Sequence, residues 1–485
     1  MGTGNRLLAI VLVAGLAACA KSTPQMLPAS GGRMGALRMR SGSMPIKHVI
    51  VVMQENRSFD NLFHGFPGAN TVNVGYGHGK QYQLQQISLK WPVDLRHDHP
   101  QFLEDYDGGK ADGFDNEITA FKMKRLGCED YINHPACWTI SKKATMQQMP
   151  FSYVKQSAIQ PYWDIATDYA LGDDAFASNN GPSFPSHQYL IAAQSGHASE
   201  VPSEQPWGCN APKNPSDPTF VYVLKHGTAD PPEFSKATGH EVHGPYPCFT
   251  YGTMADLLDN AGVTWRYYAS SLSNSGGNLS AFMAIARVYE GPDYANVVHP
   301  DTRILTDIKN GDLQQVSWVT PSGAKSDHGG PDSGDLGPDW VASIVNAVGQ
   351  SEYWQDTAIV VMWDEWGGWY DHVKPPQYHD PATGAFEGLG FRVPLLVVSP
   401  YVKAHYISHD QHEIASTAHF IEEVFGLPPL GSLTGYKHQY ADQRADAFDD
   451  MFDFSQQPLP FTPIPTKRNA RYFLTHPDNT PGDDD

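Results

Sequence analysis

Basic residues are scarce in this sequence. Its 485 residues include 33 lysines and arginines against 53 aspartates and glutamates, which gives a formal net charge of −20. A surface that follows the phosphates of a nucleic acid needs an excess of positive charge. The composition therefore argues against nucleic acid as a partner, and any phosphate group that the protein binds must be bound locally.

Cysteine is also rare, with five in the chain, and no two of them have the C-x-x-C spacing of a structural zinc site. One of them, Cys19, belongs to the amino-terminal segment. The others form an even set, which in an oxidising compartment indicates two disulfides and leaves three possible pairings. We expect each cysteine to pair with its nearest neighbour in sequence, Cys128 with Cys137 and Cys209 with Cys248.

The amino end lacks an apolar run long enough to cross a bilayer comfortably, because the run over residues 7–18 is too short. The tetrapeptide Leu16-Ala17-Ala18-Cys19 resembles a bacterial lipobox. The resemblance implies that residues 1–18 are a signal peptide and that Cys19 carries a lipid. Residues 19–45, which are small and polar, would then be a flexible tether.

This amino end predicts an exported bacterial lipoprotein with the membrane as a partner. Ala20 follows the lipid-carrying cysteine, at a position where an aspartate would favour retention in the inner membrane. We therefore expect the outer membrane, with the protein on its periplasmic or cell-surface side. The alternative is an ordinary secretory signal that ends near a cysteine, and it also leads to export.

Short apolar runs alternate with helical patterns between residues 46 and 457. Strands that alternate with helices are typical of an α/β fold with a doubly wound, mostly parallel sheet flanked by helices, and the Gly- and Pro-rich stretches predict loop-rich insertions. No internal repeat is visible. Residues 458–485 are Pro-rich with an acidic end, and we expect a disordered tail. The expected strands are 48–53, 263–268, 315–319, 358–363 and 392–399, and the expected helices are 160–170, 186–195, 253–261, 338–348 and 416–425.

Polar side chains follow two of these strands at their carboxyl ends, where α/β sheets bind ligands. Glu55 and Asn56 follow the first strand, and Asp364 and Glu365 follow residues 358–363. Adjacent carboxylates repel each other and are costly to bury unless a cation or hydrogen-bond donors compensate. Because oxygen ligands of this kind suit a hard or borderline divalent cation, we expect a metal ion of unspecified identity and number.

Ser183 and three histidines complete the expected site. A bound cation would orient and deprotonate the Ser183 hydroxyl, which is otherwise too weak an acid to attack at neutral pH. His97, His328 and His372 could bind phosphoryl oxygens and protonate a leaving alkoxide. Taken one at a time, each histidine is more often structural, and Asn56 could be a cap or turn residue.

Long motifs between residues 47 and 427 resemble the phosphoesterase family that contains bacterial non-specific phospholipases C and a group of acid phosphatases. They include HVIVVMQENRSFDNLF, NNGPSFPSHQYLIAAQSG and WDEWGGWYDHV, in this order. The resemblance implies an alkaline phosphatase-like fold for residues 46–457 and a serine or threonine nucleophile at a strand-to-helix turn. It also implies that Glu55, Asn56, Ser183, Asp364 and Glu365 bind the metal, that Ser183 is the nucleophile, and that His97, His328 and His372 contact the phosphate.

The residue at the nucleophile position separates the branches of this family. Its phospholipases usually carry threonine there, whereas Ser183-Phe184-Pro185-Ser186 looks more like the acid phosphatase branch. We therefore predict an acid phosphatase-like, metal-dependent hydrolase of phosphoric esters with a serine nucleophile. A phospholipase C that releases phosphorylated headgroups from phosphatidylcholine-type lipids is the alternative. An inactive surface-binding lipoprotein is the alternative of another class.

Overall fold

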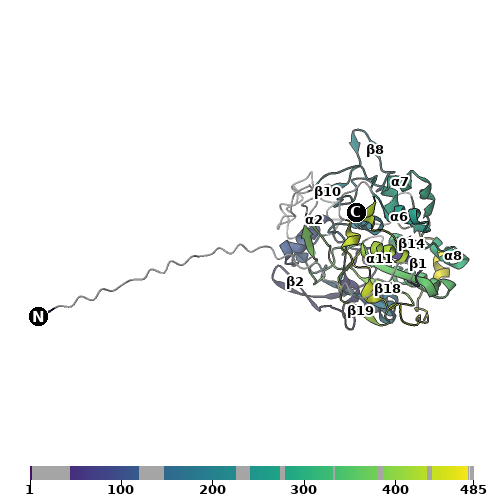
Figure 1. Cartoon of the computed structure of the whole chain (residues 1–485). Helices are drawn as coiled ribbons and strands as arrows, with labels where there is room; N and C mark the ends of the chain where they lie inside the picture. The colour runs from purple at the N-terminus through teal and green to yellow at the C-terminus, as the bar shows by residue number, and fades with distance from the viewer. Residues whose placement is uncertain are drawn as a thin grey trace. The chain divides into compact units, whose positions relative to one another are not determined.

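The computed structural model describes residues 1–2, 44–118, 147–224, 241–272, 279–330, 334–379, 386–433, 440–478 and 480 (Figure 1). The sheet and its helices lie within a unit that spans Ser41–Asp485. All but the first two residues of the expected signal peptide, most of the tether, the lipidation site Cys19, and the pair Cys128 and Cys137 lie outside the described residues. Among the helices that are described, none has both the length and the apolar character needed to cross a membrane.

An eight-stranded sheet organises the fold, with the strand order β13-β12-β14-β1-β15-β18-β6-β19. The labels of β14, β1, β18 and β19 follow this order across the molecule in Figure 1. All neighbouring strands are parallel except at β18, which is antiparallel to both of its neighbours. The strands are β1 His48–Gln54, β6 Ala170–Gly172, β12 Trp265–Tyr268, β13 Val297–Val298, β14 Val316–Val319, β15 Thr357–Trp363, β18 Leu395–Val398 and β19 Tyr406–Ser408.

The helices cover both faces of this sheet. Every residue of β15 is buried, as an apolar strand in the middle of a parallel sheet must be when both of its faces are packed. In one group, α10 (Gly337–Gly349) packs against α4 (Gln160–Asp168), α8 (Arg303–Asn310) and α12 (Ala470–Thr475). In another, α5 (Ser183–Ala192) packs against α6 (Met254–Ala261) and α11 (Ser416–Phe425). The predicted α/β class with a mostly parallel, doubly wound sheet is confirmed.

Shorter elements decorate the sheet. The remaining helices are α1 Phe59–Phe63, α2 His99–Tyr106, α7 Ala286–Tyr289 and α9 Gly323–Ser326. Short paired strands are β2 Val74–Gly77 with β3 Lys80–Gln83, β4 Gln85–Ile87 with β5 Ser152–Val154, β7 Ala175–Phe176 with β20 His412–Glu413, β8 Lys213–Asn214 with β9 Asp217–Pro218, β10 Tyr222–Leu224 with β11 Glu241–His243, and β16 Gln377–His379 with β17 Phe386–Gly388. The predicted bridge between Cys209 and Cys248 is present in this region of insertions.

The carboxyl-terminal segment differs from the expected disordered tail, because the described residues after 458 pack against α10. The ring of Phe473 lies 5.2 Å from that of Trp340, and the Asn346 side chain both donates to and accepts from the backbone of Ile464. The prolines of this stretch restrict the backbone without preventing contact. A few apolar side chains and one well-placed amide therefore fix the segment, and the composition of the stretch did not indicate this.

A buried carboxyl pair next to α11 predicts how stability depends on pH. Glu422 and Asp442 both accept a hydrogen bond from the backbone N–H of Leu430. Burial, followed by the charge of Asp442, raises the pKa of Glu422 to about 9. The native pair therefore holds a proton that the unfolded chain has already lost above pH 5. The free energy of unfolding should fall between pH 5 and pH 9, by at most about 1.4 kcal/mol per pH unit.

The substitution Glu422→Gln tests this assignment. It leaves a neutral amide beside Asp442, so the contribution of the pair to the pH slope should disappear. Urea unfolding at several pH values between 5 and 9 measures the slope for the wild type and the variant. Parallel curves for the two proteins would contradict a shared proton at this pair.

Candidate functional site

The register of β1 and β15 places the acidic residues side by side. Gln54 pairs with Trp363 in the parallel ladder, so Glu55 and Asp364 leave the two strands at the same level. The backbone N–H of Asn56 donates to Asp364 Oδ1 over 2.9 Å, and that of Glu365 donates to the same oxygen over 2.8 Å. Asp364 Oδ2 has no hydrogen-bond partner among the described residues, which leaves it available to a ligand.

The turn after β15 fits closely around Asn56. Asn56 has a left-handed backbone, with φ of +56°, which asparagine tolerates better than most residues. Gly367 also has a positive φ, and a Cβ atom at this position would lie 2.2 Å from the Asn56 carbonyl oxygen. Its N–H donates to Glu365 Oε2 over 2.7 Å. Position 367 therefore accepts only glycine. This explains why a glycine follows Trp366: the tight turn lets the chain pack against Asn56 and donate to Glu365.

Helix α5 carries a serine and a histidine on one face, and the histidine reaches the acidic residues. Ser183 is the first residue of α5, three residues before the predicted helix start, and it is fully buried. Proline is tolerated in the first turn of a helix, so Pro185 does not delay the start. His187 follows one turn later and therefore shares the helix face of Ser183. Its Nε2 lies 3.5 Å from Glu55 Oε1 and 3.6 Å from Asp364 Oδ2.

His187 was not among the predicted site residues. Burial lowers the pKa of this side chain, but the Asp364 and Glu55 carboxylates, through hydrogen bonding and charge, outweigh burial and raise the pKa to about 9 when no cation is bound between them; a bound cation would displace this proton. Neither ring nitrogen has a hydrogen-bond partner among the described residues. The spacing of four residues from Ser183 was the signal in the sequence that could have indicated it.

Two of the predicted histidines lie beside these residues. His97 Nδ1 donates to the carbonyl oxygen of Leu95 over 2.6 Å, so its Nε2 accepts from the amide nitrogen of Asn56 over 3.0 Å. The ring of His328 lies 5.7 Å from the ring of His97 and nearly perpendicular to it, and its Nδ1 contacts the carbonyl oxygen of Gly329. Asn56 therefore connects the carboxylates to the histidine pair.

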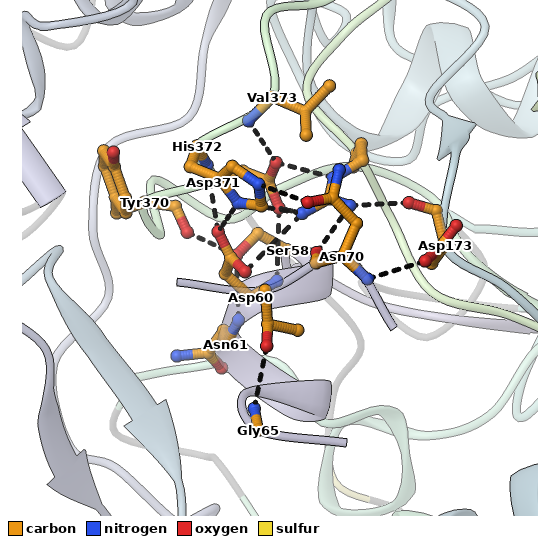
Figure 2. A network of polar contacts seen from close by, with 12 residues as sticks. Ser58, Asp60, Asn61, Gly65, Asn70, Asp173, Tyr370, Asp371, His372 and Val373 are labelled. Carbon is orange, nitrogen blue, oxygen red and sulfur yellow. Dashed lines mark hydrogen bonds and ion pairs between the residues drawn. The ribbon is translucent and has the colours of Figure 1, made fainter. Parts of the chain in front are cut away.

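His372 has other partners (Figure 2). Its Nδ1 lies 2.6 Å from Asp60 Oδ2, and its Nε2 lies 3.0 Å from Asn70 Oδ1. The neighbouring Asp371 accepts two hydrogen bonds from the buried guanidinium of Arg392, over 2.8 and 3.2 Å. Within the described part of the chain, the hydrogen bonds of His372 stay in this network and none reaches the serine at the start of α5. Its contact with phosphate stays a prediction.

The residues around Asp364 fit a divalent cation. The donor atoms of Glu55, His187 and Asp364 all lie within 4.8 Å of one another. Asn56 Oδ1 is buried without a hydrogen-bond partner among the described residues. Glu55, Asp364 and Glu365 are fully buried, and carboxylates packed together in this way need positive charge to offset their repulsion. Of the predicted ligands, Glu55, Asn56, Asp364 and Glu365 thus gather at the carboxyl ends of β1 and β15.

Comparison with known proteins shows a match between residues 46–428 and the Phosphoesterase family. The chain belongs to the phosphoesterase family. Members of this family are hydrolases that act on phosphoester bonds, and the predicted resemblance is confirmed. The match extends from the residues just before β1 to the residues just after α11, so it includes every predicted catalytic and metal-binding residue.

Several curated relatives of this phosphoesterase are phospholipases C. A non-hemolytic phospholipase C of Pseudomonas aeruginosa is 24% identical, and the match covers 92% of this chain and 65% of that protein. Phospholipase C A of Mycobacterium tuberculosis is 23% identical, with 83% of this chain and 77% of that protein covered. A solved structure from the alkaline phosphatase superfamily, from Vibrio parahaemolyticus, has a TM-score of 0.35 and 10% identity, and covers 84% of this chain and 70% of that chain.

Proposed function

We propose that this phosphoesterase hydrolyses phosphoric esters with Ser183 as the nucleophile, at a divalent cation held by Glu55, Asn56, Asp364 and Glu365. The observation that supports the proposal is the contact of α5 with the two strand ends: His187 lies against the buried carboxylates of Glu55 and Asp364, and the buried Ser183 precedes His187 by one turn on the same helix face. When bound, the cation would supply positive charge that lowers the pKa of the serine hydroxyl and stabilises phosphoryl oxygens. The metal-dependent chemistry thus requires residues that are far apart in sequence.

The protein supplies further parts of the proposed reaction. The serine hydroxyl would lose its proton and its oxygen would attack phosphorus to form a phosphoseryl group, while the ester oxygen leaves with the electrons of the broken P–O bond and takes up a proton. Water would then attack the phosphoseryl group, release phosphate and return the proton to the serine oxygen. The hydrogen bond from His97 Nδ1 to Leu95 fixes the tautomer in which Nε2 carries the lone pair, so Nε2 would exchange its hydrogen bond from Asn56 for the ester oxygen or a water when it moves a proton. The amino end of α5 favours the negative charge on the phosphoryl group.

Two substrate classes remain proposals. The serine motif favours a phosphomonoester, as in the acid phosphatase branch. The relatives named as phospholipases C favour a phospholipid, and a lipid on Cys19, as proposed from the lipobox, would hold the enzyme at its substrate. The decisive comparison uses p-nitrophenyl phosphate, p-nitrophenylphosphorylcholine and phosphatidylcholine vesicles. Hydrolysis of the first alone supports a phosphatase, and hydrolysis of the other two supports a phospholipase C.

Metal dependence has its own test. We expect chelation to abolish hydrolysis and added divalent ions to restore it. Asp364→Asn should lower the bound metal and the activity together, because Asp364 Oδ2 faces His187 and lacks another partner among the described residues. The matched control is Asp307→Asn, which removes a buried carboxylate paired with Arg266 and Tyr268. Elemental analysis after dialysis measures the metal content, and equal content in wild type and Asp364→Asn would contradict this site.

A further inference from the structure

His187 differs from the other buried histidines in how carboxylates approach it. Both Glu55 Oε1 and Asp364 Oδ2 face the same nitrogen, Nε2, at 3.5 and 3.6 Å. A charge-assisted hydrogen bond would be roughly 2.7–2.9 Å long. By contrast, His372 Nδ1 lies 2.6 Å from Asp60 Oδ2, within hydrogen-bond distance. The two carboxylates therefore approach one nitrogen of His187 at separations longer than that of a charge-assisted hydrogen bond.

These separations suit three donors that share one ion. Zinc-type ions bind imidazole nitrogen and carboxylate oxygen at about 2.0–2.2 Å, so two donors at a tetrahedral angle lie about 3.4 Å apart. The separations of 3.5 and 3.6 Å from His187 Nε2 are close to that value. His187 is 1% exposed, so bulk water does not reach its ring. Neither ring nitrogen has a hydrogen-bond partner among the described residues, so Nε2 is available to an ion.

We infer that His187 Nε2 is a direct ligand of the metal ion, which makes the site a mixed nitrogen and oxygen site selective for a transition ion over Ca²⁺ and Mg²⁺. Imidazole binds zinc, iron and related ions well, whereas sites built from oxygen alone suit Mg²⁺, Ca²⁺ and Mn²⁺. The inference rests on the proposed metal centre and names its class of ion. His97 does not fill this place, since its Nε2 accepts a hydrogen bond from Asn56.

The experiment uses Cu²⁺ as a spectroscopic probe of the untagged, chelator-treated protein. With one equivalent of Cu²⁺, electron paramagnetic resonance should show hyperfine coupling to an imidazole nitrogen in the wild type. His187→Gln should lose this coupling. The matched control is His412→Gln, because His412 is equally buried and also lies beside two carboxylates, but Asp446 and Asp450 approach different nitrogens of its ring. The control should keep the coupling.

A competition with physiological ions gives the second readout. In equilibrium dialysis, His187→Gln should lose about 10-fold or more in Zn²⁺ affinity, whereas its Ca²⁺ affinity should change much less. Absence of nitrogen coupling in the wild type would overturn the inference, and this measurement needs no variant to fold. Unchanged coupling in His187→Gln would also overturn it. Failure of metal-loaded wild type to hydrolyse any phosphoester would count against the proposed function alone.

Discussion

Ser183→Ala is expected to lower the turnover of a phosphoester by several orders of magnitude, because it removes the oxygen that would form the covalent intermediate. His97→Ala should cost less, about 10²- to 10³-fold, since it removes one polar contact and leaves the nucleophile in place. Ser183→Thr keeps a hydroxyl and adds a methyl group, so its effect should be milder than that of alanine. Measurement of kcat for the three variants ranks the effects.

The control for this series is another serine of the same helix. Ser186 is also fully buried, and its hydroxyl accepts a hydrogen bond from the side chain of Asn179 over 2.7 Å. We expect Ser186→Ala to change turnover far less than Ser183→Ala. Mass spectrometry of acid-quenched enzyme should find phosphate on Ser183. Near-wild-type turnover in Ser183→Ala, or phosphate on another residue, would refute the proposed nucleophile.

Arg392→Met is expected to reduce the free energy of unfolding by about 3–5 kcal/mol, because it leaves buried carboxylates without their cation. The guanidinium of Arg392 binds Asp371 through two nitrogens and lies 3.5 Å from Asp60, and a further nitrogen donates to the backbone oxygen of Asp173 over 2.5 Å. This side chain and both carboxylates are fully buried. Figure 2 shows Asp60 and Asp371 side by side in this network.

Two further variants identify the cause of the destabilisation. Arg392→Lys keeps the charge but not the two-nitrogen geometry, so its stability should lie between wild type and Arg392→Met. Adding Asp371→Leu to Arg392→Met should recover part of the loss, because it removes one of the stranded charges. Urea unfolding measures all of these proteins. If Arg392→Met lowered the free energy of unfolding by less than about 1 kcal/mol, the ion pairs of Arg392 would contribute little to stability.

The central strands and helix α11 were predictable because their signals are local. β1 and β15 are apolar runs that end in polar residues, and α11 matches its predicted range, Ser416–Phe425. The direction of β18 was not predictable, because the apolar pattern of a fully buried strand is the same in parallel and antiparallel pairs. The strands β6, β13 and β19 have two or three residues, which is too short for periodicity to detect.

The residues of the candidate site that follow the strands were predictable from the sequence. The residues that other segments bring to the site were harder to predict. The register of a parallel pair brings Glu55 and Asp364 together, and the rule that ligands bind at carboxyl ends indicated this. His187 was missed because its spacing of four residues from Ser183 shows only that the two share a helix face, and the contact of that helix with the strand ends is what gives the histidine a place in the candidate site. His372 lies next to Asp371 in sequence, yet the ion pair of Asp371 with Arg392 ties this segment into another network.

The position of β1 also governs when the protein can fold. This first strand lies between β14 and β15, and Asn56 donates to a carboxylate 308 residues further along the chain. Contacts of such long range close large loops before they return any stabilisation, which slows folding. A ribosome must therefore finish most of the polypeptide before β1 can pair with both of its neighbours, and no early fragment contains both Glu55 and Asp364.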